Sequence, residues 1–243
     1  MNRRELLKTA AGSAAIAMVG GSAAVSAQPQ PQQQSQPQQP NQPLPRRERV
    51  VVAFLLGEST NMIDTAGPWE VFQDSHAPGA GGAMHMPFEL ITVAENTEGR
   101  RMTGGFHTRA HHSFADAPQP NVIVVPAHRG SAASLAWLRQ ASAGADITMS
   151  VCTGAFQLAR AGLLEGYPVT THHEFWDSFA REFPSLELRR GPRFVDSGRI
   201  ATAGGLTSGI DLALHVVGRY FGIDAAAATA EYMEHSSNAW RAA

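Results

Sequence analysis

The amino-acid sequence predicts a doubly wound α/β fold, in which helices cover both faces of a mainly parallel sheet. Short runs of β-branched and aliphatic residues recur along the chain, without the polar alternation typical of a half-exposed strand. Helical patterns separate these runs, and strand–helix–strand connections form right-handed crossovers. The chain has 243 residues, of which 43% are hydrophobic and 16% are charged, so it can bury one large core.

The expected elements follow one another from residue 50. The run 50–56 is the first buried strand, and a helix follows from about Thr65 to Asp74 with Pro68 in its first turn. Three further runs have the composition of buried strands and lie at 88–94, 122–125 and 147–151. Two further helices are expected at 131–141 and 156–164. The glycines within 79–82 predict a surface loop.

The first 27 residues have the features of a twin-arginine export signal. Arg3 and Arg4 precede a leucine pair, and an Ala/Gly-rich stretch ends at Ala27 in a small-residue cleavage site. The alternative is an uncleaved membrane anchor, but glycines and hydroxyl residues make this segment a poor membrane span. We therefore expect a mature protein that begins at Gln28, after export in a folded state to the periplasm.

Residues 28–45 consist almost wholly of Gln and Pro and have no apolar period that buries a face. This composition predicts a disordered linker, which acts either as a spacer or only as a tolerated tail. The folded domain is expected over 46–243. Without residues 1–27 the chain has 16 basic and 20 acidic residues, an acidic balance that favours neither nucleic-acid binding nor stable membrane insertion.

Cys152 is the single cysteine and the strongest candidate for chemistry. It lies in the segment Ser150–Ala155, where a buried strand ends, small residues make a turn and a helix begins, which is the layout of a nucleophile elbow. Backbone N–H groups at a helix N-terminus favour a thiolate and hold a developing oxyanion. The alternative is a buried structural cysteine. Its place at the carboxyl end of a strand, where open α/β sheets bind ligands, favours the catalytic interpretation.

Several motifs, in order along the chain, resemble the ThiJ/PfpI family, whose fold is shared with class I glutamine amidotransferases. They are Asn61–Pro68, Ser150–Ala155, Ala161–Gly166, Val169–His172 and Thr202–Asp211. The resemblance covers nearly all of residues 46–232. Within the family, the Asp-x-x-Gly-Pro pattern at Asp64 and the Cys-Thr-Gly elbow are most similar to the isonitrile hydratase branch and to the input domains of AraC-type regulators. Those regulators continue into a helix-turn-helix domain, so for a chain that ends soon after Tyr232 we do not expect DNA binding.

The resemblance implies that Cys152 is the nucleophile, that Asp64 is the carboxylate beside it and that Thr153 contributes its backbone N–H. A carboxyl group in contact with a thiol takes its proton and returns it to the intermediate, so the two groups titrate as a unit. Asp64 and Thr153 each have a structural alternative. Asp64 is a suitable N-cap for a helix that starts at Thr65, and Thr153 is an ordinary cap for the elbow helix.

One loop departs from the family pattern. After the third expected strand the family has Pro-Gly-Gly, whose glycine N–H approaches the thiolate, whereas this chain has Pro126-Ala127-His128. Such a change keeps a backbone donor but excludes a conformation that only glycine adopts. The expected substrate-binding residues are therefore Ala127, His128 and Gly154, with the His128 imidazole either near Cys152 or facing solvent.

We expect neither a metal ion nor a cofactor. Five histidines are candidates for metal ligands, namely His107, His111, His112, His172 and His173. However, they lack the spacing of a known metal-binding motif, and adjacent residues such as His111 and His112 point to opposite faces of a strand. For His172, which follows a family motif, packing or hydrogen bonding beside the pocket is the simpler role.

The sequence thus predicts an exported, cysteine-dependent enzyme that acts on a small molecule. The resemblance implies hydration of an isonitrile to an N-substituted formamide, through a thioimidate on Cys152. Two alternatives stay open: a ligand-binding or redox-sensing module without turnover, and glyoxalase-like or amidase-like chemistry at the same thiol. The resemblance also implies a homodimer. Aromatic residues at helical spacings supply core or dimer contacts, and they are Trp69, Phe72, Phe175, Trp176 and Phe179.

Overall fold

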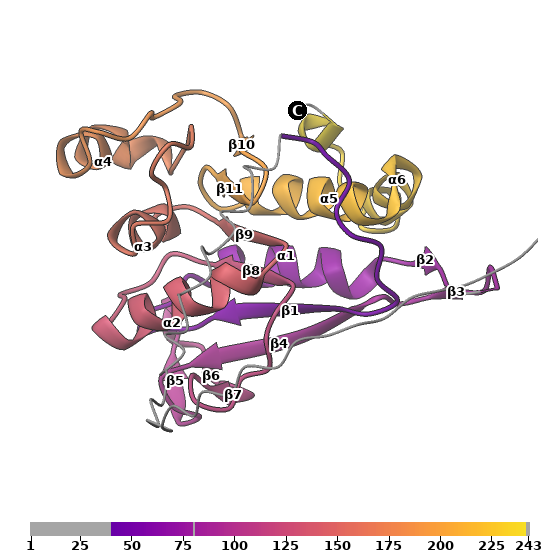
Figure 1. The fold of residues 1–243 in the computed structure, drawn as a ribbon, viewed down its shortest axis with the longest axis horizontal. Coiled ribbons are helices and arrows are strands. Elements are labelled where there is room, and N and C mark those ends of the chain that lie inside the picture. The colour runs from indigo at the N-terminus through magenta and orange to yellow at the C-terminus, as the bar shows by residue number, and fades with distance from the viewer. Residues whose placement is uncertain (1–39, 80, 242–243) are drawn as a thin grey trace, which may run out of the picture. The chain divides into compact units, whose positions relative to one another are not determined.

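The structure is a computed structural model that describes residues 40–79 and 81–241 (Figure 1). The expected export signal and most of the Gln/Pro-rich segment lie outside these residues. Within the described ranges, no helix has both the length and the hydropathy needed to cross a membrane.

A seven-stranded sheet forms the centre of the domain, with the order β10-β11-β9-β8-β1-β4-β7. All neighbouring strands in this sheet run parallel except β10 and β11, which are antiparallel. The predicted doubly wound, mainly parallel sheet is therefore confirmed. The strand bounds are β1 Val50–Leu55, β4 Phe88–Ala94, β7 His112–Ser113, β8 Val122–Val125, β9 Ile147–Ser150, β10 Phe194–Asp196 and β11 Ile200–Ala203.

Two short antiparallel hairpins lie outside the main sheet. The glycine-rich segment 79–82, expected as a surface loop, joins the strands of the first hairpin. The second hairpin precedes β7 and borders a cavity described below. The strand bounds are β2 Ala77–Pro78, β3 Met84–His85, β5 Gly99–Arg101 and β6 His107–Arg109.

Helices cover both faces of the sheet, as Figure 1 shows. In β1, Val52 and Phe54 pack into one hydrophobic cluster with α1, α5 and α6, whereas Ala53 and Leu55 pack into another with α2, α3 and α4. This double burial explains why the strand is apolar at every position. The α-helices are α1 Met62–Asp74, α2 Ala132–Gly144, α3 Gly154–Arg160, α4 Trp176–Glu182, α5 Ser208–Phe221 and α6 Ile223–Tyr232. The 3-10 helices are η1 Thr103–Gly105, η2 His173–Phe175 and η3 Ala239–Arg241.

Helix α1 begins three residues earlier than the sequence suggested. Asn61 is its N-cap, because the side-chain oxygen of Asn61 accepts hydrogen bonds from the backbone N–H groups of Ile63 and Asp64. The alternative role of Asp64 as the cap is therefore wrong. The earlier start also places Pro68 in the interior of the helix rather than in its first turn.

The elbow helix α3 is shorter than the expected 156–164 helix and begins earlier, at Gly154. It ends at Arg160, and Gly162 just beyond has φ +73°, a conformation suited to leaving a helix. Helix α2 begins after Ser131, whose side chain forms a reciprocal capping pair with Ser134. Local capping thus accounts for the start of α2.

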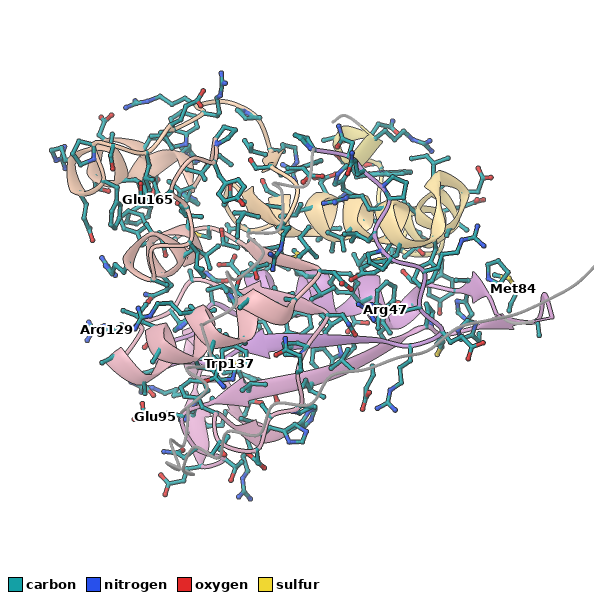
Figure 2. The ribbon with its side chains drawn as sticks, viewed as in Figure 1. Arg47, Met84, Glu95, Arg129, Trp137 and Glu165 are labelled. Carbon is teal, nitrogen blue, oxygen red and sulfur yellow. The ribbon has the colours of Figure 1, made fainter. Side chains whose placement is uncertain are left out.

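The packed domain begins before residue 46. Leu44 is buried, and its N–H donates to the carbonyl of Arg219, whose Nε donates in turn to the carbonyl of Gln42. The linker expected over 28–45 therefore ends before Gln42. Arg47, labelled in Figure 2, forms a two-bond ion pair with Asp146 at the start of β9.

The strand order creates a crevice at the carboxyl edge of the sheet. From β1 the chain first adds β4 on one side and later β8 on the other, so the connections diverge between β1 and β8. Open α/β sheets bind ligands at such a divergence. The segments 56–61, 126–130 and 151–154 leave the carboxyl ends of β1, β8 and β9 and meet there.

Candidate active site

Cys152 occupies a strained turn between β9 and α3. Its φ is +58°, a left-handed conformation that costs a non-glycine residue about 1 kcal/mol or more. Two hydrogen bonds hold the turn: the Cys152 N–H donates to the Gly204 carbonyl at 2.8 Å, and Thr171 Oγ1 donates to the Cys152 carbonyl at 2.8 Å. The geometry is that of a nucleophile elbow.

Gly154 lets the elbow helix approach β8. A Cβ at this position would lie 1.9 Å from the Val125 carbonyl oxygen, so only glycine fits. The Gly154 N–H donates to the Val151 carbonyl at 3.0 Å. Packing therefore explains the glycine by itself, and its N–H is already used within the protein.

Asp64 is completely buried beside the elbow. Its Oδ2 accepts a hydrogen bond from the Ala127 N–H at 3.1 Å, while Oδ1 has no hydrogen-bond partner among the described residues. The Cys152 side chain and the Leu206 backbone N–H also interact with the carboxyl group. No described arginine, lysine or histidine forms an ion pair with it.

The two groups hold protons more tightly than they do in water. Burial raises the pKa of the Asp64 carboxyl to about 6, against the opposing effect of its N–H donors. Burial, followed by the nearby Asp64 charge, raises the pKa of the Cys152 thiol to about 12. The expected effect of the N–H groups on the thiolate is present, but it is smaller than the effect of burial. The N–H donors do lower the thiol pKa, but a helix of seven residues does not offset burial next to a carboxylate.

Both shifts point to one proton shared by the pair near neutral pH. The carboxylate can accept the thiol proton when an electrophile approaches the sulfur, and it can then return that proton to the adduct. The arrangement thus supplies a nucleophile and a general acid–base in contact, with little water around them.

Thr153 interacts with the thiol in two ways. Its backbone N–H and its hydroxyl both lower the pKa of Cys152. The hydroxyl makes no capping hydrogen bond to α3, although Thr153 holds the N-cap position. The side chain is therefore directed to the sulfur rather than to the helix end.

Ala127 and His128 follow β8 and make contacts in different parts of the structure. The Ala127 N–H binds Asp64, so it is not a free donor for a substrate anion while that carboxylate is charged. The His128 Nδ1–H donates to the Pro126 carbonyl at 2.8 Å, and its ring packs on Gly57, where a Cβ would lie 2.3 Å from Cδ2. Burial lowers the pKa of His128. The suggestion that its imidazole approaches Cys152 is wrong, because close packing turns the ring toward β1.

Leu206 is the site residue that the sequence argument missed. It lies in the turn between β11 and α5 with φ +55°, and its backbone N–H interacts with both Asp64 and Cys152. The available signal was the Thr202–Asp211 motif of the resemblance, which does not give the direction of one N–H group. On the adjoining side, Gly205 contacts His172 so closely that a Cβ would lie 2.0 Å from the imidazole.

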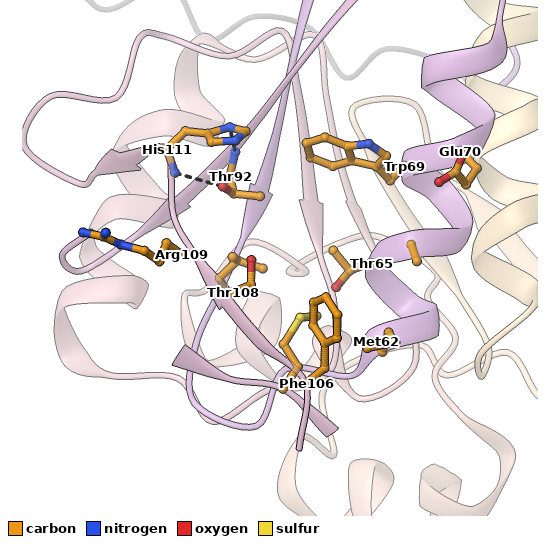
Figure 3. A pocket seen from close by; sticks show the side chains of 12 residues that line it. Met62, Thr65, Trp69, Glu70, Thr92, Phe106, Thr108, Arg109 and His111 are labelled. Carbon is orange, nitrogen blue, oxygen red and sulfur yellow. Dashed lines mark hydrogen bonds between the residues drawn. The ribbon is translucent and has the colours of Figure 1, made fainter. Parts of the chain in front are cut away.

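A cavity of about 400 Å³ lies against α1, and Figure 3 shows the side chains that line it. Met62 and Trp69 line it from the helix, Phe106 borders it from the loop before β6, and the His111 ring faces Trp69 with ring centroids 6.3 Å apart. Cys152 and Asp64 do not line this cavity. Helix α1 therefore presents the Asp64 carboxylate on one face and an apolar recess on the other.

The candidate metal ligands are dispersed in the structure. His111 Nδ1 accepts the Thr92 N–H at 3.2 Å, and His112 lies 3.7 Å from Asp116. His172 and His173 stack on each other near α4, with ring centroids 4.5 Å apart. Within residues 40–79 and 81–241, no three His, Cys, Asp or Glu residues gather as a metal site would require.

The elbow, the buried carboxylate and the sheet order define the chain as a doubly wound protein with a cysteine at a strand-to-helix elbow. Residues 50–219 match the model of the DJ-1/PfpI family. An isonitrile hydratase of Pseudomonas putida is 31% identical over 183 residues, which are 72% of this chain and 74% of that protein. The chain belongs to the DJ-1/PfpI family, as its motifs predicted.

Regulators and solved structures are also similar. The HTH-type transcriptional regulator GbdR of Pseudomonas aeruginosa is 38% identical over 82 residues, 34% of this chain and 22% of the regulator. A ThiJ/PfpI family protein from Pseudomonas syringae matches with a TM-score of 0.69 and 23% identity, over 80% of this chain and 78% of that one. An AraC family regulator from Pseudomonas putida matches with a TM-score of 0.65 and 20% identity, over 76% of this chain and 99% of the regulator structure. These two structural matches establish the fold alone.

Proposed function

We propose that the protein is a cysteine-dependent hydratase that adds water to an isonitrile and releases an N-substituted formamide. The observation that carries the proposal is the contact between a strained, elbow-borne Cys152 and a buried Asp64 that has no cation partner. The similarity to an isonitrile hydratase supports this choice among the reactions that such a pair can catalyse.

The proposed reaction begins with addition of the thiol to the terminal isonitrile carbon. Asp64 accepts the Cys152 proton as the sulfur–carbon bond forms, and then delivers it to that carbon, which gives a thioimidate. Water adds to the carbon–nitrogen double bond, with one proton passing to nitrogen. Collapse of this adduct breaks the carbon–sulfur bond and forms the formamide, and the hydroxyl proton returns through Asp64 to the sulfur. One isonitrile and one water are consumed.

A second candidate is a ligand-binding or redox-sensing module without turnover. The similarity to transcriptional regulators supports it. In this role two equivalents of peroxide would oxidise the thiol to a sulfinate. Glyoxalase-like and amidase-like reactions use the same thiol and form a further alternative.

The deciding experiment is a substrate panel assayed with wild-type protein and Cys152→Ala. The panel contains aliphatic and aromatic isonitriles, methylglyoxal and simple amides, with products measured by mass spectrometry. We expect formamide from at least one isonitrile with the wild type and a loss of roughly a thousandfold or more in Cys152→Ala. Ser178→Ala, on the surface of α4, is the matched control. Conversion of methylglyoxal or an amide alone, or peroxide sensitivity without any turnover, would reject the hydratase.

Export to the periplasm is proposed together with this activity. The twin-arginine pattern at Arg3 and Arg4 supports it, although that segment lies outside the described residues. Replacing both arginines by lysine should retain the protein in the cytoplasm. N-terminal sequencing of periplasmic protein should give Gln28 as the first residue, and a sequence that still begins at Met1 would contradict cleavage.

We also propose that the protein forms a homodimer through the outer face of α1. The apolar recess at Trp69 and the exposed Phe106, 55% accessible, support an association there. Light scattering at micromolar concentrations should give a dimer mass. Ala66→Arg in the recess should give a monomer, whereas the matched control Ala136→Arg on α2 should not. A monomeric wild type would reject the proposal.

A further inference from the structure

A cavity of about 310 Å³ lies at the carboxyl edge of the sheet, outside the reactive pair. The segments 56–58, 95–96 and 128–131 line it, and they follow the strands β1, β4 and β8. Arg100, on β5, forms a further part of the wall. Neither Cys152 nor Asp64 is among the residues that line this cavity. A molecule bound there would therefore meet different chemistry from that of the elbow.

Four charged side chains line this cavity, namely Glu58, Glu95, Arg100 and Arg129. Figure 2 shows Glu95 and Arg129 at the same end of the domain. None of the four forms an ion pair with another described residue, so the two carboxylates and the two guanidinium groups lie beyond ion-pair distance from one another. Opposite charges thus line one cavity without neutralising each other.

The hydrogen bonds of these side chains leave their charges uncompensated. The Ser131 hydroxyl donates to Glu95 at 3.1 Å, and a terminal nitrogen of Arg100 donates to the backbone and side-chain oxygens of Asn96, both at 3.1 Å. Ser131 and Asn96 are neutral. The charged groups therefore keep both their charge and hydrogen-bonding capacity for a ligand.

Two further atoms of the wall, Arg100 Nε and His128 Nε2, are buried without a partner among the described residues. Arg100 Nε is a donor. His128 Nε2 is an acceptor, because the proton of the neutral ring lies on Nδ1, which donates to the Pro126 carbonyl at 2.8 Å. Burial lowers the pKa of His128 and so favours this neutral form. Unpartnered buried groups are unfavourable, and a ligand with both donors and acceptors would satisfy them once the partly buried Arg100 side chain turns.

This set of groups selects a ligand that carries both charges. A simple anion would be repelled by Glu58 and Glu95, and a simple cation would be repelled by Arg100 and Arg129. An α-amino acid has a carboxylate, which a guanidinium binds through two parallel hydrogen bonds, and an ammonium group with three donors for carboxylate oxygens. The volume of about 310 Å³ is at the lower end of the range for ligand sites, so it favours a small side chain.

We propose that this cavity binds a small free α-amino acid, with Arg100 and Arg129 around its carboxylate and Glu58 and Glu95 around its ammonium group. The proposal does not depend on hydration of an isonitrile, because the site lies outside the reactive pair. It assigns the protein a second ligand, whose binding can be measured without turnover.

Isothermal titration calorimetry with L-alanine and L-serine tests the proposal. At least one of them should bind the wild-type protein with a Kd of about 1 mM or tighter. Propionate lacks the ammonium group of alanine and ethylamine lacks its carboxylate, so each should bind at least about tenfold more weakly than alanine. Arg100→Gln and Glu95→Gln each remove one charge from the wall, and each should weaken binding of the amino acid about tenfold.

The matched controls are Arg101→Gln and Glu98→Gln, which remove the same charges from neighbouring exposed positions outside the cavity. Both should bind the amino acid as the wild type does, and so should Cys152→Ala. Circular dichroism and thermal melting establish that each variant is folded.

Absence of binding for both amino acids would overturn the inference, as would binding of propionate or ethylamine as tight as that of alanine. Wild-type affinity in folded Arg100→Gln and Glu95→Gln would also overturn it, and so would an equal loss in Arg101→Gln and Glu98→Gln. Loss of binding in Cys152→Ala would place the amino acid at the elbow instead of in this cavity.

Discussion

Asp196 and Asp64 are buried to nearly the same degree, but they differ in their charged partners and in the direction of their pKa shifts. The Asp196 side chain is 2% exposed. It accepts hydrogen bonds from His215 at 2.8 Å and from Arg219 at 3.1 Å. Burial alone would raise the pKa of its carboxyl, but the hydrogen bond from His215 and the charge of Arg219 bring that pKa below its ordinary value. Asp64 is 0% exposed, has no cation partner within the described part of the chain and has a pKa raised to about 6.

The difference shows that the partners of a buried carboxylate, rather than its burial, decide what it does. Asp196 joins β10 to α5, and Arg219 extends this network to the carbonyl of Gln42 in the N-terminal segment. Asp64 has no ion pair with a described residue that would compensate for its burial, so its ionised form destabilises the fold. Carboxylates kept under such conditions are typical of sites where proton transfer is needed.

The largest expected effect on stability comes from breaking the Asp196 network. Asp196→Asn leaves the buried guanidinium of Arg219 without its counter-charge, and we expect the free energy of unfolding to fall by about 3–5 kcal/mol. Urea denaturation at pH 7 measures this change. Asp177→Asn, at an exposed position, is the control and should change the value by less than about 0.5 kcal/mol. A similarly small change for Asp196→Asn would remove the distinction between a paired carboxylate and a surface one.

The second effect concerns turnover. Asp64→Asn keeps the shape of the side chain and an oxygen acceptor for the Ala127 N–H, but it cannot carry a proton. We expect turnover to fall on the order of a hundredfold or more while the protein stays folded. Steady-state kinetics of purified Asp64→Asn, beside Asp177→Asn, measure the loss. Wild-type turnover in Asp64→Asn would reduce Asp64 to a structural residue.

The smallest effect is the pH dependence of stability. The pKa of Asp64 is raised from 3.8 to about 6 on folding, so between those values the folded protein keeps a proton that the unfolded chain has lost. The contribution of this group to the free energy of unfolding is therefore full below pH 4 and falls by about 3 kcal/mol as the pH rises past 6.

Asp64→Asn should lack this decrease and should be more stable than the wild type above pH 6. Denaturation curves from pH 4 to pH 7.5 for both proteins, taken as a difference, isolate the contribution. Parallel curves, or a variant that is less stable at pH 7, would show that the folded protein tolerates the Asp64 charge without cost.

Local patterns predicted much of the fold. The runs of apolar residues identified β1, β4, β8 and β9 because strands buried on both faces need apolar side chains at every position. The helix bounds were less accurate. Asn61 and Asp64 are equally good caps by residue type. In the structure Asn61 caps α1, and Asp64, inside the helix, binds the Ala127 N–H instead.

The direction of site groups was not predictable from the same patterns. His128 was a candidate neighbour of Cys152, yet Gly57, 71 positions earlier, leaves the space that its ring fills. Leu206 had no chemical signal, because the group that matters is a backbone N–H, which every residue except proline possesses. The direction of this N–H depends on the turn around it, in which Gly204 forms hydrogen bonds with Cys152 and Arg193. No local sequence pattern encodes these bonds.

By itself, the sequence determined four strands of the main sheet and the first three helices, the position of the cysteine at a strand end and the family motifs, because each of these depends on residues close together in the chain. The tertiary structure decided which carboxylate acquired cations, which N–H groups were free to face the sulfur and how strongly the thiol holds its proton. These properties depend on burial and on distances between segments far apart in the chain, so they exist only once the sheet is assembled.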